Sequence, residues 1–205
     1  GPIPDTPITR SDFAGNLESA ETLDRKMGQV LDALDSANLG ETTIVICTTD
    51  HGPDFPRMKG EVNDHGTGVF LIVRGPGIPP EPRTVDALVS QVDIYPTLCE
   101  WLGIDAPGHL EGTSFFPLLT GESGQTRDAV FAESNFHATY EPARSIRTER
   151  YRYIRHFDAA RKCIHRLRLD IRPTQRSFID HGLDDFPQPE EELYDVFFDR
   201  NEADN

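Results

Sequence analysis

The fold class follows from one stretch of ten residues, Thr43-Ile44-Val45-Ile46-Cys47-Thr48-Thr49-Asp50-His51-Gly52. Its first seven residues are β-branched or apolar almost without interruption, which predicts a strand buried on both faces of a sheet. An Asp-His-Gly turn follows at once. Because open α/β sheets bind ligands beyond the ends of their strands, this stretch predicts an α/β domain with polar chemistry at the end of a central strand.

A helix precedes this strand and a second strand follows it. Apolar residues recur at three- and four-residue steps over residues 13–34, with Ser11 or Asp12 as the capping residue and Gly40 just past the end. This spacing predicts an amphipathic helix. Residues 69–73 (Val-Phe-Leu-Ile-Val) repeat the pattern of a buried strand. A layered α/β domain accounts for this order of elements.

The rest of the chain predicts a second, smaller unit. Asp93 is expected to cap a further helix, which ends at Gly103. Beyond that helix the segments become shorter and predict small antiparallel strands at residues 129–133, 143–147 and 150–154. We therefore expect an α/β portion in residues 1–120 and a smaller α+β unit with a short antiparallel sheet in residues 121–205.

Composition excludes several classes of protein. The 205 residues include 35 acidic and 20 basic side chains, and the net charge of −15 argues against a nucleic-acid binder. No apolar run approaches the ~18 residues of a membrane span. Three cysteines without a CxxC pair argue against a disulfide framework and a zinc site. No signal peptide opens the chain, and since its first residue is not Met, the localisation stays unknown.

Charge is spread unevenly along the chain. Residues 144–176 contain eleven basic and three acidic side chains, a net charge of +8, whereas the remainder carries −23. Such a basic segment could hold an anionic ligand. Alternatively, it is a solvated face that pairs with the acidic residues between 184 and 204, and charge alone favours this second interpretation.

The Asp-His-Gly turn is the first candidate site. The carboxylate of Asp50 suits calcium or magnesium, and the imidazole of His51 also accepts zinc or manganese. Taken alone, these three residues favour a turn in which Asp50 caps backbone amides. The following loop adds Arg57 and Lys59 and returns through a second Asp-His-Gly sequence at 64–66. Metal ligands beside cations are typical of an oxyanion site, so Asp50 and His51 are expected to converge in a cleft.

Five short blocks, in order, resemble the sulfatases of the alkaline phosphatase superfamily. The blocks are residues 49–52 with Lys59 and 71–77, residues 92–98 with 102–104, residues 111–114 with 117–121, residues 147–154, and residues 192–195. Residues 55–56 and 140–144 are similar to the sulfamidase (N-sulfoglucosamine sulfohydrolase) branch. The resemblance implies that residues 1–120 are the C-terminal part of a sulfatase-type mixed-sheet sandwich domain.

The resemblance also implies roles for individual residues. Asp50 and His51 would complete a calcium site, although many sulfatases have Asn at the second position. Lys59 would be the catalytic residue that binds the sulfate oxygens and neutralises charge on the transferring group. Further candidate substrate ligands, each also explained as a turn or surface residue, are His65, His137, Tyr140 and Arg144.

One part of the family's machinery lies outside this sequence. Sulfatases form their nucleophile, formylglycine, from a Cys or Ser in a Cys/Ser-x-Pro-x-Arg motif, and no residue here lies in that motif. We therefore expect the missing N-terminal half to supply the formylglycine. We expect this fragment alone to be inactive, to bind calcium weakly or not at all, and to expose an apolar face where the missing half docks.

The partners implied are a sulfated small molecule or glycan and the missing half, with a homo-oligomer left open; neither nucleic acid nor a membrane is expected.

Two alternatives to a sulfatase stay open. One is a phosphodiesterase or phosphonate hydrolase of the same superfamily, which uses the Asp-His site for phosphorus. The other is a non-catalytic sulfatase-like module that binds an anion or a partner.

Overall fold

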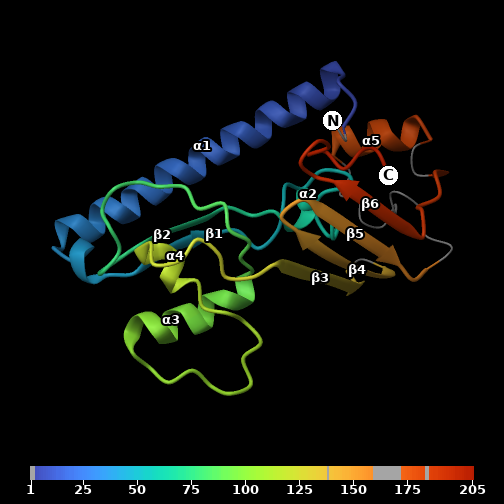
Figure 1. Ribbon diagram of the computed structural model, residues 1–205. Helices are drawn as coiled ribbons and strands as arrows, with labels where there is room; N and C mark the ends of the chain where they lie inside the picture. The colour runs from blue at the N-terminus through green and yellow to red at the C-terminus, as the bar shows by residue number, and fades with distance from the viewer. Residues whose placement is uncertain (1–2, 138, 159–171, 183–184) are drawn as a thin grey trace.

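The computed structural model describes residues 3–137, 139–158, 172–182 and 185–205. These residues form two antiparallel sheets with helices around them (Figure 1). The strands are β1 (Val45–Thr48) and β2 (Leu71–Arg74) in the first sheet, and β3 (Ala129–Phe136), β4 (Tyr140–Thr148), β5 (Tyr151–His156) and β6 (Glu191–Asp195), in that order, in the second. The helices are α1 (Pro7–Ser36), α2 (Asp64–Thr67), α3 (Ile94–Leu102), α4 (Phe116–Thr120) and α5 (Pro173–Asp180), with short 3-10 turns η1 (Gly40–Thr42) and η2 (Gln91–Asp93). The predicted α/β class with a small antiparallel sheet is confirmed.

Helix α1 begins earlier than its apolar pattern. Thr6 is the N-cap: its hydroxyl accepts a hydrogen bond from the backbone N–H of Thr9 at 3.2 Å, and the Thr9 hydroxyl accepts one from the N–H of Thr6 at 2.9 Å. This reciprocal cap starts the helix upstream of Ser11 and Asp12, so the predicted cap is wrong. Asp12 instead accepts a hydrogen bond from the backbone N–H of Thr174, in α5, at 3.2 Å.

The apolar stripe of α1 is only partly covered. Phe13 stacks on Phe55, a buried residue of the loop between β1 and β2, with 4.5 Å between ring centroids. In contrast, Leu17 is 60% exposed and Val30 62% exposed. Helix α1 therefore lies along the first sheet with much of its apolar surface in solvent (Figure 1). Within the described residues, no helix combines the length and apolarity needed to cross a membrane.

Strands β1 and β2 pair antiparallel, with Val45 opposite Arg74 and Thr48 opposite Leu71. The prediction that both strands are buried on both faces is wrong for this structure, because all of β1 is half-buried and Ile72 in β2 is 64% exposed. Among the described residues no third strand pairs with either of them. Both edges of the sheet therefore stay open.

Asp93 connects three segments and does not cap α3 with its side chain. Its fully buried carboxylate accepts hydrogen bonds from the backbone N–H groups of Ser90 and Thr113, each at 2.7 Å, and pairs with Arg127. Helix α3 has no side-chain cap and ends, as predicted, at Gly103, whose φ of 65° is left-handed. Asp93 therefore holds the N-cap position of α3, as predicted, but its carboxylate makes no capping hydrogen bond there and binds Ser90, Thr113 and Arg127 instead.

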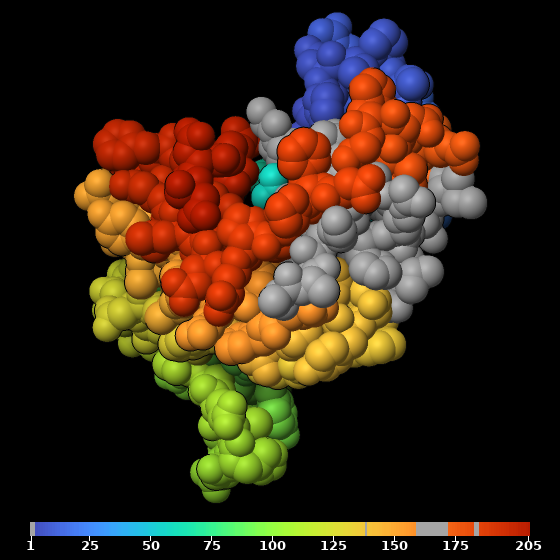
Figure 2. All heavy atoms as spheres, turned by 90° about the vertical axis from the view of Figure 1, so that its right-hand side faces the viewer, coloured from blue at the N-terminus to red at the C-terminus, as the bar shows by residue number. Residues whose placement is uncertain are grey.

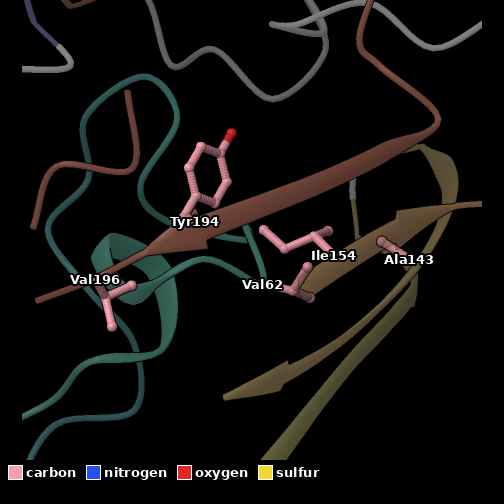
Figure 3. Close-up of a cluster of buried hydrophobic side chains, with 5 residues drawn as sticks. All are labelled: Val62, Ala143, Ile154, Tyr194 and Val196. Atoms are coloured by element: carbon pink, nitrogen blue, oxygen red, sulfur yellow. The ribbon is translucent and has the colours of Figure 1, made fainter. Parts of the chain in front are cut away.

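The second sheet contains the predicted short strands and holds the main apolar cluster. This cluster consists of Val62, Ala143, Ile154, Tyr194 and Val196 (Figure 3). Four of its members lie in the sheet or directly after β6, whereas Val62 comes from the loop between β1 and β2. The loop that carries the candidate site therefore packs on the small sheet.

Arginines of the basic segment pair with carboxylates of the acidic C-terminal segment. The pairs are Arg150–Asp195 (2.7 Å), Arg152–Glu202 (2.9 Å) and Arg155–Glu190 (3.6 Å). Figure 2 shows the C-terminal residues in red gathered against the yellow-to-orange residues of the small sheet. Three arginines thus pair with the acidic segment as this interpretation expects, whereas Arg144, Arg147, Arg172 and Arg176 pair with carboxylates elsewhere. Residues 159–171 of the basic segment lie outside the described residues.

Candidate functional site

Asp50 and His51 follow β1 after one residue, Thr49, and their side chains converge. The Nε2 atom of His51 lies 3.6 Å from Oδ2 of Asp50, and its Nδ1 atom lies 2.7 Å from the carbonyl oxygen of Gly52. The predicted convergence is confirmed. The predicted cleft is wrong for the described residues, because 88% of the Asp50 side chain is exposed. Within the described chain no backbone N–H donates to Asp50, so its carboxylate is open to a ligand.

Two glycines pack the two Asp-His-Gly sequences against each other. The backbone N–H of Gly52 donates to the carbonyl oxygen of Gly66 at 2.9 Å. A Cβ atom on Gly52 would collide with the carbonyl oxygen of His65, and one on Gly66 would collide with the carbonyl oxygens of Met58 and Glu61. Only glycine permits such close backbone contact. The turn after β1, the following loop and α2 therefore form one compact unit.

Asn63 holds the loop that carries Lys59. Arg57 has a φ of 63°, which is rare for a residue other than glycine, and Gly60 has a φ of 78°. The side-chain amide of Asn63 donates to the carbonyl oxygen of Arg57 at 3.0 Å and accepts from the backbone N–H of Gly66 at 2.9 Å. Lys59 is half-buried, and its ammonium group has no hydrogen bond or ion pair within the described residues. A fixed backbone thus presents a cation that no described residue pairs.

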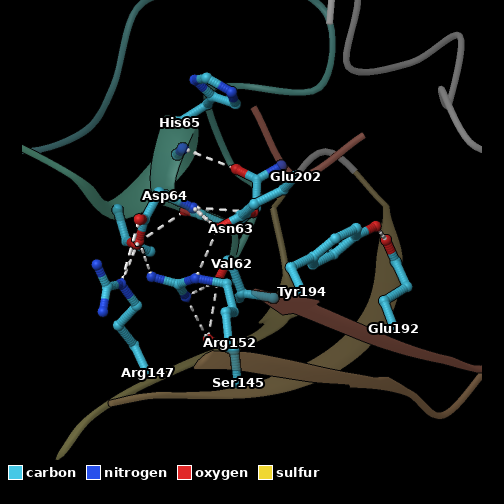
Figure 4. A network of polar contacts seen from close by, with 12 residues as sticks. Val62, Asn63, Asp64, His65, Ser145, Arg147, Arg152, Glu192, Tyr194 and Glu202 are labelled. Carbon is cyan, nitrogen blue, oxygen red and sulfur yellow. Dashed lines mark hydrogen bonds and ion pairs between the residues drawn. The ribbon is translucent and has the colours of Figure 1, made fainter. Parts of the chain in front are cut away.

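Arg152 of β5 joins this loop to the small sheet (Figure 4). Its side chain is 3% exposed, and its guanidinium group lies between two acidic residues. Its partners are the carboxylates of Asp64 and of Glu202 (2.9 Å), the carbonyl oxygen of Val62 (2.6 Å) and Oγ of Ser145 (3.1 Å). Arg147 also approaches the Asp64 carboxylate, at 3.2 Å. Two arginines and two carboxylates therefore balance one another at the base of the loop.

Two family models match the chain. The model for sulfatases matches residues 5–104, and the model for the C-terminal region of N-sulphoglucosamine sulphohydrolase matches residues 59–175, which is more than half of the chain. This chain belongs to the sulfatase family. The sulfatase model covers the whole compact unit between β1 and β2. The second model begins at Lys59, so both models cover the unit from Lys59 onward.

Known sulfatases similar to this chain are much longer. A Delta 4,5-hexuronate-2-O-sulfatase of Bacteroides thetaiotaomicron is 34% identical over 145 residues, which is 65% of this chain and 30% of the relative. Human N-sulphoglucosamine sulphohydrolase is 30% identical over 164 residues, 74% of this chain and 32% of the relative. A solved 2-O GAG sulfatase is 29% identical with a TM-score of 0.65, covering 89% of this chain and 35% of that chain. The chain thus spans about a third of these relatives.

The ligands of this sulfatase-family chain fit a divalent metal only in part. The open carboxylate of Asp50 is the type of oxygen ligand that calcium prefers, whereas the imidazole of His51 is a less favoured ligand for it. In the described residues no three His, Cys, Asp or Glu side chains come together. Because calcium takes six to eight ligands, most of them would have to come from outside the described residues.

Two of the candidate sugar ligands already have protein partners. The Nε2 atom of His65 lies 3.4 Å from the carbonyl oxygen of Asn201. Arg144 pairs with Glu133 at 3.0 Å and donates to Oδ1 of Asn135 at 2.9 Å, so its guanidinium group is fixed on the surface of the small sheet. A substrate role for either residue stays a prediction.

The other two candidates lie where β3 and β4 connect. His137 is exposed in the connection, and Tyr140, the first residue of β4, is 64% exposed. Among the described residues, neither side chain forms a hydrogen bond or ion pair with the loop around Lys59, so the described part of the chain does not bring the four candidates together. Their exposure leaves them accessible to a ligand, and their roles stay predictions.

A second buried network involves Glu192. Its carboxylate lies 2.7 Å from Nε2 of His156 and accepts hydrogen bonds from the hydroxyl of Tyr194 and the amide of Gln188. Burial by itself raises the pKa of Glu192, but the hydrogen bonds from His156 and Tyr194 outweigh it and hold that pKa below its ordinary value. Burial and the adjacent Glu192 raise the pKa of Tyr194. This network stabilises the small sheet.

Glu202, in the cluster around Arg152, takes up a proton unusually readily. Burial, only partly offset by the charge of Arg152, raises the pKa of Glu202 from its ordinary 4.5 to about 7. Its carboxylate also accepts the backbone N–H of Asp64 at 3.2 Å. Protonation of Glu202 is therefore coupled to the packing of α2 on the small sheet.

We expect Glu202 to make the protein less stable as pH rises from about 4.5 to 7. The pKa of Glu202 is higher in the folded state than in the unfolded state, so the stabilisation is complete below pH 4.5 and is lost as pH rises through 7. The full difference is about 3 kcal/mol. Urea unfolding at pH 5 and pH 8 should show a smaller loss for Glu202→Gln than for the wild type. Glu190→Gln, at an exposed carboxylate, is the control. An unchanged loss in Glu202→Gln contradicts this assignment.

Proposed function

We propose that this chain supplies the sulfate-binding lysine and part of the metal site of an enzyme that hydrolyses sulfate esters or N-sulfo groups. The observation that carries the proposal is the ammonium group of Lys59, which has no partner among the described residues and sits on a backbone fixed by Asn63 and packed through Gly66 and Gly52 against the Asp-His turn. Membership of the sulfatase family and the similarity to a 2-O-sulfatase support it.

Lys59 would act on the sulfate group. The charge distribution over the sulfate oxygens and the leaving group changes as the bond from sulfur to the leaving oxygen or nitrogen breaks. The sulfate oxygens carry negative charge in that transition state. An ammonium group beside those oxygens stabilises the transition state more than the ground state. Because Lys59 has no competing partner among the described residues, its charge is available for this role.

Asp50 and His51 would hold calcium together with ligands from outside this chain. Bound calcium supplies Lewis-acid polarisation of the sulfate oxygens. The nucleophile, which the family resemblance gives as formylglycine, would also come from outside this chain, since no Cys or Ser here lies in the required motif. In this proposal the chain contributes only two metal ligands, and the structure brings together two suitable groups, the carboxylate of Asp50 and the imidazole of His51.

The substrate we propose is a sulfated glycan. Similar proteins are named for a 2-O-sulfated hexuronate and for N-sulphoglucosamine, and both names describe sulfated sugars. His137 and Tyr140 are accessible and could contact the sugar. Arg144 and His65 would have to leave protein partners to do so.

The proposal is tested by the product that the intact protein releases. The probes are glucosamine N-sulfate, a Δ4,5-hexuronate 2-O-sulfate disaccharide and bis(4-nitrophenyl) phosphate, each with calcium. Inorganic sulfate is measured by ion chromatography and 4-nitrophenol by absorbance. We expect sulfate from one of the first two probes and little hydrolysis of the third. Hydrolysis of the phosphodiester alone would favour a phosphorus enzyme, and binding without turnover a non-catalytic module.

The exposed apolar residues of α1 and β2 support a further part of the proposal. We propose that residues 1–120 complete a larger α/β domain whose remaining part covers Leu17, Val30 and Ile72, all at least 60% exposed here. Residues 1–205 alone should therefore self-associate. Sedimentation velocity tests this expectation, and a monodisperse monomer that unfolds cooperatively would contradict it.

A further inference from the structure

We infer that Asn63 is a positioning residue for Lys59, and that Arg152 anchors Asn63 to the small sheet. This inference rests on the proposed function, since it takes Lys59 as the group that binds sulfate. Asn63 binds the carbonyl oxygen of Arg57, two residues before Lys59, and Arg152, far along the chain, binds the carbonyl oxygen of Val62, the residue before Asn63.

Both ends of the Asn63 side chain are used. Its amide nitrogen donates to the carbonyl oxygen of Arg57 at 3.0 Å, while its amide oxygen accepts the backbone N–H of Gly66 and so caps α2. The side chain is buried. Arg57, whose left-handed backbone is unfavourable for a residue with a side chain, stands two positions before Lys59. The hydrogen bond from Asn63 therefore fixes the conformation from which the lysine projects.

Arg152 holds both sequence neighbours of Asn63. Its guanidinium group binds the backbone of one sequence neighbour of Asn63, at the carbonyl oxygen of Val62, and the side-chain carboxylate of the other, Asp64 (Figure 4). The Arg152 side chain is almost fully buried and projects from the middle of a sheet, where its own position is well determined. Asn63 thus cannot shift without breaking contacts to β5.

The competing explanation is that Asn63 only caps α2. Asp caps helices about as well as Asn, so Asn63→Asp retains the acceptor for Gly66. What it removes is the donor to Arg57, because a carboxylate oxygen would face the carbonyl oxygen of Arg57. If Asn63 only caps α2, Asn63→Asp should release sulfate at the normal rate. If Asn63 positions Lys59, the same variant should release sulfate more slowly.

The test compares variants of the intact protein in two backgrounds. Asn63→Asp should reduce the turnover number for glucosamine N-sulfate or the 2-O-sulfated disaccharide about 10- to 100-fold, since a misplacement of about 1 Å can cost a hundredfold. In the Lys59→Ala background, Asn63→Asp should reduce the remaining turnover number by less than about threefold, because Asn63 acts through Lys59. Asn38→Asp, which makes the same charge change at an exposed left-handed residue, should have no effect.

Hydrogen exchange separates this inference from the proposed function. In Asn63→Asp the amides of residues 55–61 should exchange at least tenfold faster, while the urea midpoint falls less than in Asn63→Ala. Unchanged exchange, a fall in midpoint as large as in Asn63→Ala, or an equal loss of turnover in both backgrounds would overturn the positioning role. If the wild type releases no sulfate, the proposed function fails, and the exchange result still decides whether Asn63 holds the loop.

Discussion

Replacing Lys59 by alanine in the intact protein is expected to reduce sulfate release about a hundred- to thousandfold. Loss of one preorganised donor from an oxyanion site typically costs about 2.7–4 kcal/mol of transition-state stabilisation. The free energy of unfolding should change by no more than about 0.5 kcal/mol, because the ammonium group has no partner among the described residues. Sulfate release and the urea midpoint, measured on the same preparation, separate the two effects.

The matched control for Lys59 is Lys26, which is exposed on α1. Lys26→Ala removes the same charge and should leave turnover unchanged. Near-normal sulfate release by Lys59→Ala would reject the sulfate-binding role. A large fall in its urea midpoint would identify a structural lysine instead.

Replacing Asp93 by alanine is expected to give the largest loss of stability, about 3–5 kcal/mol. The change leaves the guanidinium group of Arg127 partly buried without its carboxylate and removes the acceptor for the backbone N–H groups of Ser90 and Thr113. Urea unfolding measures the loss. Removal of both charges in Asp93→Ala/Arg127→Met should recover part of it, because no unpaired charge then stays in the interior.

Asp105 provides the control for this second prediction, since it is an exposed acidic residue beyond α3. Asp105→Ala should change the free energy of unfolding by no more than about 0.5 kcal/mol. A loss below about 1 kcal/mol for Asp93→Ala would show that the segments before α3 and around Thr113 are held mainly by other contacts.

The features that sequence reasoning predicted well depend on neighbouring residues. The short strands of the second sheet follow from alternation within a few positions, and the end of α3 follows from Gly103. The convergence of Asp50 and His51 was predicted because the two residues are adjacent after a strand. In each case the deciding interaction is local.

The features that sequence reasoning missed depend on distant residues. Alternation along β5 places Arg152 on the face of Ile154 and Arg155 on the opposite face, but it does not predict that Arg152 binds the carbonyl oxygen of Val62, 90 positions earlier. Asp93 has the residue type and position of a helix cap, but partners 20 and 34 positions later determine its role. Asn63 could have been recognised from its place before the Asp-His-Gly sequence as a cap, but its bond to Arg57 depends on the left-handed turn.

The most direct test of a calcium-dependent sulfatase is sulfate release by the intact protein as a function of free calcium, for the wild type and Asp50→Asn. We predict that chelation abolishes release by the wild type and that added calcium restores it. Asp50→Asn, which loses the charge of one proposed ligand, should need a higher calcium concentration for half-maximal release. Sulfate release that survives chelation, or an unchanged calcium dependence in Asp50→Asn, would contradict the proposed metal site.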